Sequence, residues 1–327
     1  MKELTKETKS FTKDLEQLQQ EVKKWENAFK SPAELVDDWA ETLTADIGKE
    51  LTTGIPSFDK DLRGRLRGKV GAYIGYGGTK KSLLALQSMI DSTKQDRRGL
   101  YSTMEMPASL LLERIIDQTM EIPEMTFKQV SLHYEQIYHQ NKESVTGALK
   151  NGLTSIFGDR FQVTQQNRMT VDDYRNFIIK YNNTFGELDI LIVDGLSMMG
   201  GKGKGETDDY TTNSGELKDL AKEFNIYIPL ICHLSKGATK HTRDTQRYIR
   251  GSEKILDNVD FVIMMSLIEN ELEGDYYQDK GYVRMYNKRG SGNTISKIYN
   301  FNQHRLLLEE TDEDVNLYEV TETKQRF

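Results

Sequence analysis

The stretch from Lys69 to Leu86, KVGAYIGYGGTKKSLLAL, contains the pattern that decides the fold. A short apolar run, Val70 to Ile74, leads into a glycine-rich turn, and leucines at helical spacing follow the turn. A phosphate-binding loop requires this order of strand, loop and helix, because the amides of the loop and of the helix N-terminus then point at the phosphates. The stretch therefore predicts a nucleotide site.

The turn matches seven of the eight positions of the pattern G-x-x-x-x-G-K-[ST], with Lys80 in place of the second glycine. In such loops the lysine reaches the β- and γ-phosphates and the hydroxyl meets Mg²⁺, which assigns Lys81 to ATP and Ser82 to the metal. If position 80 needs a positive φ, lysine there costs about 1 kcal/mol, which could reduce ATP affinity or turnover. The expected nucleotide contacts are Gly75, Gly77, Gly78, Thr79, Lys80, Lys81, Ser82 and Leu83.

The composition limits the classes of protein that the chain can belong to. Its 327 residues suffice for one large domain with additions or for two domains, and 37% hydrophobic with 29% charged residues suits a globular protein in water. A net charge of −7 argues against nucleic-acid binding by bulk charge but allows a basic stripe along one channel. The single Cys232 excludes an intrachain disulfide framework and a cysteine-built zinc site, and indicates an intracellular compartment. No apolar run is long enough to predict a spanning helix.

Apolar runs alternate with helical patterns along the chain, which predicts an α/β fold with a mostly parallel sheet flanked by helices. The glycine-rich residues 200–215 read as a polar loop, and two runs around KRGSGN read as a hairpin. The expected strands are Val70 to Ile74, Leu100 to Met104, Phe161 to Thr164, Leu188 to Val193, Ile226 to Cys232, Phe261 to Ser266, Gly281 to Asn287 and Ile295 to Phe301. Ligands of parallel sheets bind beyond the carboxyl ends of the strands, where Gly75, Glu105, Asp194 and His233 all fall.

Each of these strand-end residues has a chemical and a structural interpretation. Asp194 follows an apolar strand, as a magnesium-side carboxylate does, although it could also cap a helix. Glu105 could polarise the attacking water or simply favour a helix dipole. His233 could hydrogen-bond the γ-phosphate or be a satisfied structural histidine. Lys288 and Arg289, at the hairpin tip, could reach a neighbouring subunit's nucleotide or form a solvated turn.

Taken together, these segments resemble the RecA-like motor domain of DnaB-family replicative helicases, from about Leu51 to about Leu308. TGIPSFDKDL is similar to the segment before the Walker A strand, and STMEMPASLLLERI to the segment with the catalytic glutamate. MTVDDYRNFI and LDILIVDGLSMM resemble the helix and Walker B strand. LKDLAKEFNIYIPLICHLSK, RYIRGSEKILDNVDFVIMM and NKRGSGNT resemble the sensor strand, the exit of a DNA loop with the next strand, and the arginine-finger hairpin.

The resemblance implies catalytic roles for Glu105, for His233, where the family commonly has glutamine, and for Arg289, favoured over Lys288. It places Mg²⁺ on Ser82 and Asp194. It also implies that two polar loops line a DNA channel. The basic residues of those loops are Lys202, Lys204, Lys236, Lys240, Arg243, Arg247 and Arg250.

By this resemblance the chain is an ATP- and Mg²⁺-dependent DNA helicase that forms a ring hexamer on single-stranded DNA during replication, with a primase or helicase loader as a possible partner and no membrane. The expected setting is the cytoplasm of a bacterial or phage-infected cell. Residues 1–45 would form a helical arm in place of the family's N-terminal domain, packed on its own domain or docked on a neighbour. Residues 46–310 would form the motor and 311–327 an acidic tail. The alternatives are a recombinase-like (RecA/RadA-like) or regulatory ATPase that forms filaments, and a non-catalytic binding protein with a decayed loop.

Overall fold

The computed structural model describes residues 50–120, 146–201, 206–233, 255–270, 275–290 and 292–313, together with positions 31, 32, 36, 143 and 315. By its contacts the chain divides into two units, Met1–Gly48 and Lys49–Phe327, and every element below belongs to the second. The predicted N-terminal arm lies almost wholly outside the described residues, as does most of the acidic tail. None of the helices within these ranges is long and apolar enough to cross a membrane.

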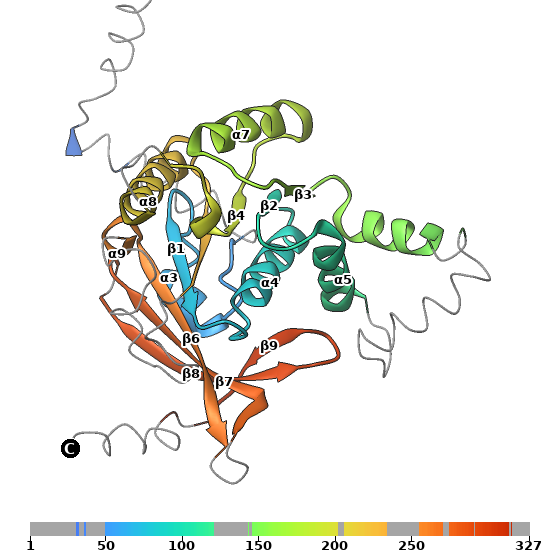
Figure 1. Cartoon of the computed structure of the whole chain (residues 1–327), viewed down its shortest axis with the longest axis vertical. Helices are drawn as coiled ribbons and strands as arrows, with labels where there is room; N and C mark the ends of the chain where they lie inside the picture. The colour runs from blue at the N-terminus through green and yellow to red at the C-terminus, as the bar shows by residue number, and fades with distance from the viewer. Residues whose placement is uncertain are drawn as a thin grey trace, which may run out of the picture. The chain divides into compact units, whose positions relative to one another are not determined.

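One mixed sheet organises this unit (Figure 1), with the strand order β3-β2-β4-β5-β1-β6-β7-β8-β9. The strands from β3 to β6 run parallel, whereas β6 to β9 pair antiparallel. The parallel strands are β1 (Val70–Gly75), β2 (Gly99–Thr103), β3 (Phe161–Gln165), β4 (Ile190–Asp194), β5 (Ile228–His233) and β6 (Phe261–Asn270). The antiparallel strands are β7 (Asp275–Asn287), β8 (Thr294–Asn302) and β9 (Leu307–Glu310). The prediction of a mostly parallel sheet is therefore confirmed.

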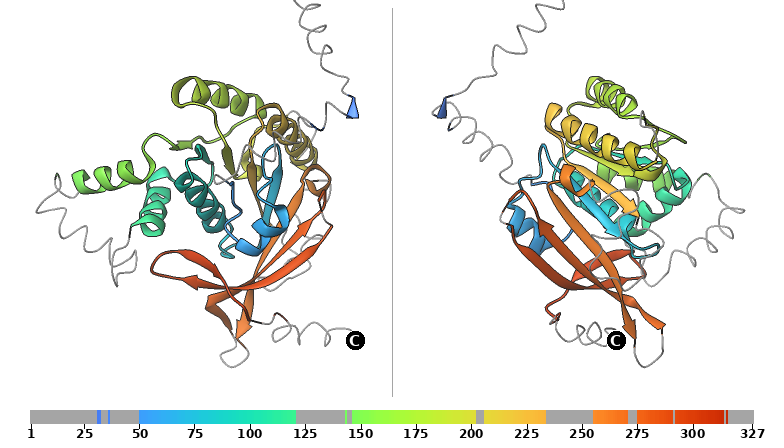
Figure 2. Two further views of the ribbon diagram at one scale, coloured as in Figure 1. Left: turned by 180° about the vertical axis from the view of Figure 1, so that it is seen from behind. Right: turned by 60° about the vertical axis from the view of Figure 1, so that its left-hand side comes forward.

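Helices flank the sheet, and the antiparallel strands extend away from the parallel part (Figure 2). The helices are α3 (Pro56–Leu62), α4 (Lys81–Lys94), α5 (Ala108–Thr119), α7 (Val171–Phe185), α8 (Glu206–Glu223) and α9 (Ile255–Asn258), with a 3₁₀ turn η1 (Leu196–Met198). Residues 146–157 are also helical. Thr170 begins α7 with a capping box, because its side chain accepts from the Asp173 amide while the Asp173 carboxylate accepts from the Thr170 amide.

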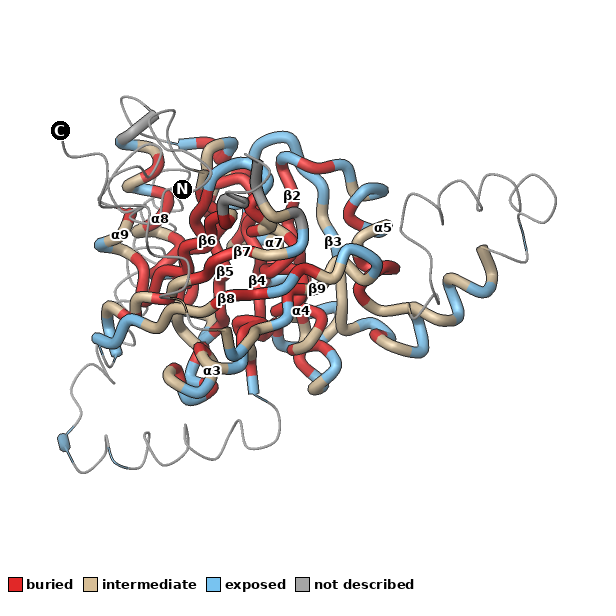
Figure 3. Tube along the Cα trace, turned by 90° about the horizontal axis from the view of Figure 1, so that it is seen from below, coloured by how far each residue is buried: buried red, intermediate tan, exposed pale blue. Residues whose placement is uncertain are grey.

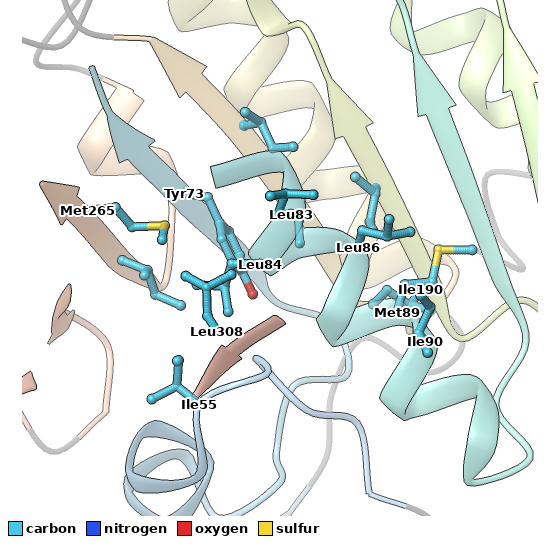
Figure 4. Packing of buried hydrophobic residues seen from close by; sticks show 14 of the residues in the cluster. Ile55, Tyr73, Leu83, Leu84, Leu86, Met89, Ile90, Ile190, Met265 and Leu308 are labelled. Atoms are coloured by element: carbon cyan, nitrogen blue, oxygen red, sulfur yellow. The ribbon is translucent and has the colours of Figure 1, made fainter. Parts of the chain in front are cut away.

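The apolar core lies on both faces of the sheet, where buried residues are concentrated (Figure 3). On one face, alternate residues of β1 pack with residues of α7 and α8. On the other face, Tyr73 and Ile190 pack with the apolar side of α4 and with Leu308 of β9 (Figure 4). The helix that follows the phosphate loop is thereby held between the parallel strands and the last antiparallel strand.

Two expectations about connecting segments have different outcomes. The hairpin around KRGSGN is confirmed, since β7 and β8 pair from Lys280↔Asn300 to Tyr286↔Thr294. The expectation of a polar loop over residues 200–215 is wrong in part, because α8 begins at Glu206. The glycines that suggested a loop lie mostly before the helix, and Tyr210, Asn213 and Ser214 are buried on its inner side. Burial of that side stabilises a helix in a segment of weak intrinsic propensity.

Candidate nucleotide site

The phosphate loop joins β1 to α4 and depends on its glycines for its shape. A Cβ atom at Gly75 would clash with Thr79 Oγ1 and would lie 2.5 Å from the Met265 carbonyl oxygen, so only glycine fits there. Gly78 has φ +84°, and a Cβ at Gly77 or Gly78 would meet nothing within 4 Å. The loop is thus tight on the side of the sheet and open on the side where phosphates would lie.

Lys80 adopts the left-handed conformation that the motif normally gives to glycine, with φ +71° and ψ +17°. The concern that a lysine at this position is strained is therefore confirmed. Its ammonium lies 4.3 Å from the centroid of the Phe301 ring on β8, which places the side chain over the antiparallel part of the sheet. Burial lowers the pKa of Lys80, and the nearby Arg114 lowers it further. Lys80 thus ties the loop to β8 by a cation–π contact.

Helix α4 begins without a side-chain cap and without an acidic residue in its first turn. Its first amides therefore remain available to an anion, and the helix dipole favours negative charge there. Lys81 is buried and donates from Nζ to the Tyr76 carbonyl oxygen at 2.8 Å. Burial lowers the pKa of Lys81 to about 8, against the opposing effect of Asp194 and Glu105. A buried ammonium beside a helix N-terminus is a strong site for phosphate.

The carboxyl ends of β2, β4, β5 and β1 meet at one edge of the sheet, as the sequence predicts. Thr103 pairs with Asp194, and Gly75 with His233, so these ends lie in adjacent registers. Glu105 follows β2 by two residues, and its carboxylate lies 3.0 Å from His233 Nε2. Because Glu105 and Asp194 both raise the pKa of Lys81, the two carboxylates lie within electrostatic reach of the loop.

Asp194 has the environment of a metal-side carboxylate. Its Oδ2 accepts a hydrogen bond from the Tyr101 hydroxyl at 2.8 Å, while its buried Oδ1 has no hydrogen-bond partner among the described residues. Burial raises the pKa of Asp194, and the hydroxyls of Tyr101 and Ser82 oppose that rise. An orphaned carboxylate oxygen beside a serine hydroxyl fits Mg²⁺, which binds one or two carboxylates together with substrate phosphates. Tyr101 was missed by sequence reasoning, although it lies on a strand that ends at the site.

The two hairpin cations are not part of this constellation. Asn287, at the end of β7, pairs with Phe261, which pairs with Gly71 near the start of β1. Lys288 and Arg289 therefore lie at the edge of the sheet opposite the phosphate loop. Lys288 Nζ donates to the Leu256 carbonyl at 2.5 Å, and Arg289 donates to the Asp257 carbonyl at 2.6 Å.

The predicted DNA-binding residues cannot be placed relative to this site. They lie in two segments outside the described residues, 202–205 and 234–250. The members of the set are Lys202, Lys204, Lys236, Lys240, Arg243, Arg247 and Arg250.

The fold and the loop define the class of protein as a RecA-like P-loop NTPase. The model of the DnaB-like helicase C-terminal domain matches residues 50–305, and the chain belongs to this family. No curated protein sequence matches the chain.

Solved structures share the fold at low sequence identity. A separately solved ATPase domain has a TM-score of 0.72 at 13% identity over 87% of this chain and 100% of that chain. A DnaB-like replicative helicase, described with its interactions with primase, has a TM-score of 0.68 at 14% identity over 86% of this chain and 67% of that chain. The KaiC-like protein PH0186 from Pyrococcus horikoshii has a TM-score of 0.52 at 15% identity over 80% of this chain and 98% of that chain.

Proposed function

We propose that this protein is an ATP-driven DNA helicase that moves on single-stranded DNA as a ring hexamer, with ATP bound between subunits. The observation that carries the proposal is the meeting of Lys81, Glu105, Asp194 and His233 at one edge of the sheet. Membership of a helicase family supports the substrate class, and this constellation supports hydrolysis. Action in replication, in the cytoplasm of a bacterial or phage-infected cell, belongs to the same proposal.

Phosphoryl transfer to water needs neutralised charge, an oriented nucleophile and an aligned leaving group. Lys81 and the open amides of α4 hold the β- and γ-phosphates. Ser82 and Asp194 would hold Mg²⁺, which when bound neutralises charge developing on the phosphate oxygens. Glu105 accepts a proton from the attacking water as the bond between γ-phosphorus and the bridging oxygen breaks.

His233 and Glu105 form a pair whose contact joins the catalytic edge to the end of β5. With the carboxylate 3.0 Å from Nε2, His233 orients Glu105 before water attacks. Loss of the γ-phosphate would change the charge that this pair faces. Movement of the pair would reach residues 234–250, where we place one of the two DNA-contacting loops.

The hairpin supports the assembly part of the proposal. Arg289, with Lys288 as the second candidate, lies too far along the sheet to serve the nucleotide of its own subunit. In a ring it would approach the γ-phosphate of the neighbour, where an arginine finger stabilises the charge of the transition state. A primase or a helicase loader is the partner that we propose outside the ring, in keeping with the primase interactions named for the DnaB-like structure.

The test is ATP turnover with and without single-stranded DNA for wild type, Lys81→Ala and Glu105→Gln. Wild type should be stimulated by DNA, and each variant should lose roughly 100-fold or more of its turnover. Lys180→Gln on α7, an exposed cation distant in the fold from the loop, is the matched control. An absence of DNA-stimulated turnover in wild type would refute the motor and favour the non-catalytic alternative. Filaments rather than closed rings on DNA in micrographs would favour the recombinase-like alternative.

A further inference from the structure

A second concave site lies at the opposite edge of the sheet from the phosphate loop, between α3 with the turn after it and the β7–β8 hairpin. Its volume is about 680 Å³, within the range of small-molecule sites. Five cations line it, with one carboxylate. They are Lys60, Arg63, Arg65, Lys69, Arg289 and the carboxylate of Asp61.

The turn between α3 and β1 is shaped to present its arginines. Residues 63–69 read RGRLRGK, and Arg63, Gly64 and Gly68 all have positive φ. Leu66 is fully buried and anchors the turn, whereas Arg63 and Arg65 before it are exposed. Because the buried anchor follows directly on the cations, both guanidinium groups are directed to the surface of the pocket.

The positive charge of the pocket is not neutralised within the described residues. Lys60, Arg63 and Arg65 form no ion pair there, and the lining carboxylate, Asp61, accepts from Asn287 Nδ2 at 2.8 Å and Asn293 Nδ2 at 2.9 Å. These two bonds fix the hairpin to α3. Burial lowers the pKa of Lys69, against the opposing effect of Asp260, and neighbouring cations including Arg65 lower it further. A set of unpaired cations held at fixed positions favours an anionic ligand.

The shape and chemistry of the pocket favour a compact polyphosphate over a nucleic-acid strand. No aromatic side chain is among the described residues that line it, whereas sites for single strands stack bases on aromatic rings. We infer that the pocket binds the triphosphate of a nucleotide held in the phosphate loop of a second copy of this chain, with Arg63 and Arg65 contacting it beside Arg289. This inference rests on the proposed assembly with ATP between subunits.

The inference is tested by mixing two variants that are defective in opposite halves of the shared site. Lys81→Ala has a defective loop and an intact pocket, and the double variant Arg63→Gln/Arg65→Gln has an intact loop and a neutralised pocket. Each alone should lose roughly 10-fold or more of its ATP turnover, the scale of one hydrogen bond to a charged group. An equal mixture should recover roughly one quarter of wild-type turnover, because one interface in four then joins an intact loop to an intact pocket.

Several outcomes would overturn the inference while leaving the helicase proposal intact. One is wild-type turnover in the Arg63→Gln/Arg65→Gln variant, and another is a mixture no more active than its parts. A variant with normal turnover and a weaker, less salt-dependent affinity for single-stranded DNA would assign the pocket to nucleic acid instead. Lys180→Gln should behave as wild type in every arm.

A direct binding measurement separates the inference from the helicase proposal. Calorimetry with inorganic tripolyphosphate on Lys81→Ala protein, whose own loop is impaired, should detect a site that the added Arg63→Gln/Arg65→Gln changes abolish. If wild type hydrolyses no ATP, the motor proposal fails, and this titration still decides the pocket. Equal tripolyphosphate binding with and without the two arginines would refute the pocket.

Discussion

Replacing Lys80 by glycine sets three opposing contributions to stability against one another. A side chain at φ +71° costs about 1–2 kcal/mol, which glycine relieves. Losing the contact between the Lys80 ammonium and the Phe301 ring, at 4.3 Å, removes about 0.5–2 kcal/mol. Glycine also loses more backbone freedom on folding, by about 0.5–1 kcal/mol. We therefore expect Lys80→Gly to change the free energy of unfolding by less than about 1 kcal/mol.

The informative comparison is Lys80→Ala, because alanine loses the ring contact and keeps the strained Cβ. Urea denaturation should find the glycine variant more stable than the alanine variant by about 0.5–1 kcal/mol. A glycine variant less stable than the alanine variant would refute the argument from backbone strain. A double-mutant cycle of Lys80→Ala with Phe301→Leu should return a coupling of about 0.5–1 kcal/mol for the ring contact.

The same variants decide what Lys80 does for catalysis. Lys80→Gly should preserve or raise ATP turnover, because glycine is the residue that the motif has at this position. A collapse of turnover in a variant that remains stably folded would show that the Lys80 ammonium has a role of its own at the nucleotide. In that case Lys80→Arg, which keeps the cation, should retain more activity than Lys80→Gly.

Three further perturbations follow from charges at and near the site. Since burial lowers the pKa of Lys81 to about 8, ATP affinity should fall as pH rises from 7 to 9 and the ammonium loses its proton, while Lys81→Arg should keep a flat profile in a fluorescent-nucleotide titration. Burial raises the pKa of Asp117 from 3.8 to about 7, so folded protein binds more protons than unfolded protein between these values and stability falls as pH rises through them; Asp117→Asn should flatten that fall in urea denaturation at pH 5 and pH 8, and an unchanged slope would contradict the assignment. Tyr101→Phe removes the hydrogen bond to Asp194 Oδ2 and should raise the Mg²⁺ concentration needed for half-maximal turnover roughly 10-fold, with an unchanged requirement counting against Asp194 as the metal-side carboxylate.

The class of fold could be predicted from the sequence because its signals are local. Buried parallel strands are continuous apolar runs, and Leu188 to Val193 is such a run, close to β4 as observed. The phosphate loop is a contiguous motif, so its glycines and Lys81 could be assigned without knowing what surrounds them. Glu105, Asp194 and His233 could be grouped only through a topological rule, that parallel strands end at the same edge. The register of β2 with β4 and of β5 with β1 confirms that rule here.

Only the tertiary structure decided which groups contact one another across long separations in the chain. The pairing of His233 with Glu105 joins residues 128 positions apart, and that of Tyr101 with Asp194 joins residues 93 apart. The partner of Lys80 is a phenylalanine on β8, which no pattern near the loop indicates. The cationic pocket combines a turn before β1 with a hairpin more than two hundred residues later. Sequence periodicity reports which side of an element is buried, whereas the packing of α3 and α4 against the antiparallel strands determines what each polar side chain meets.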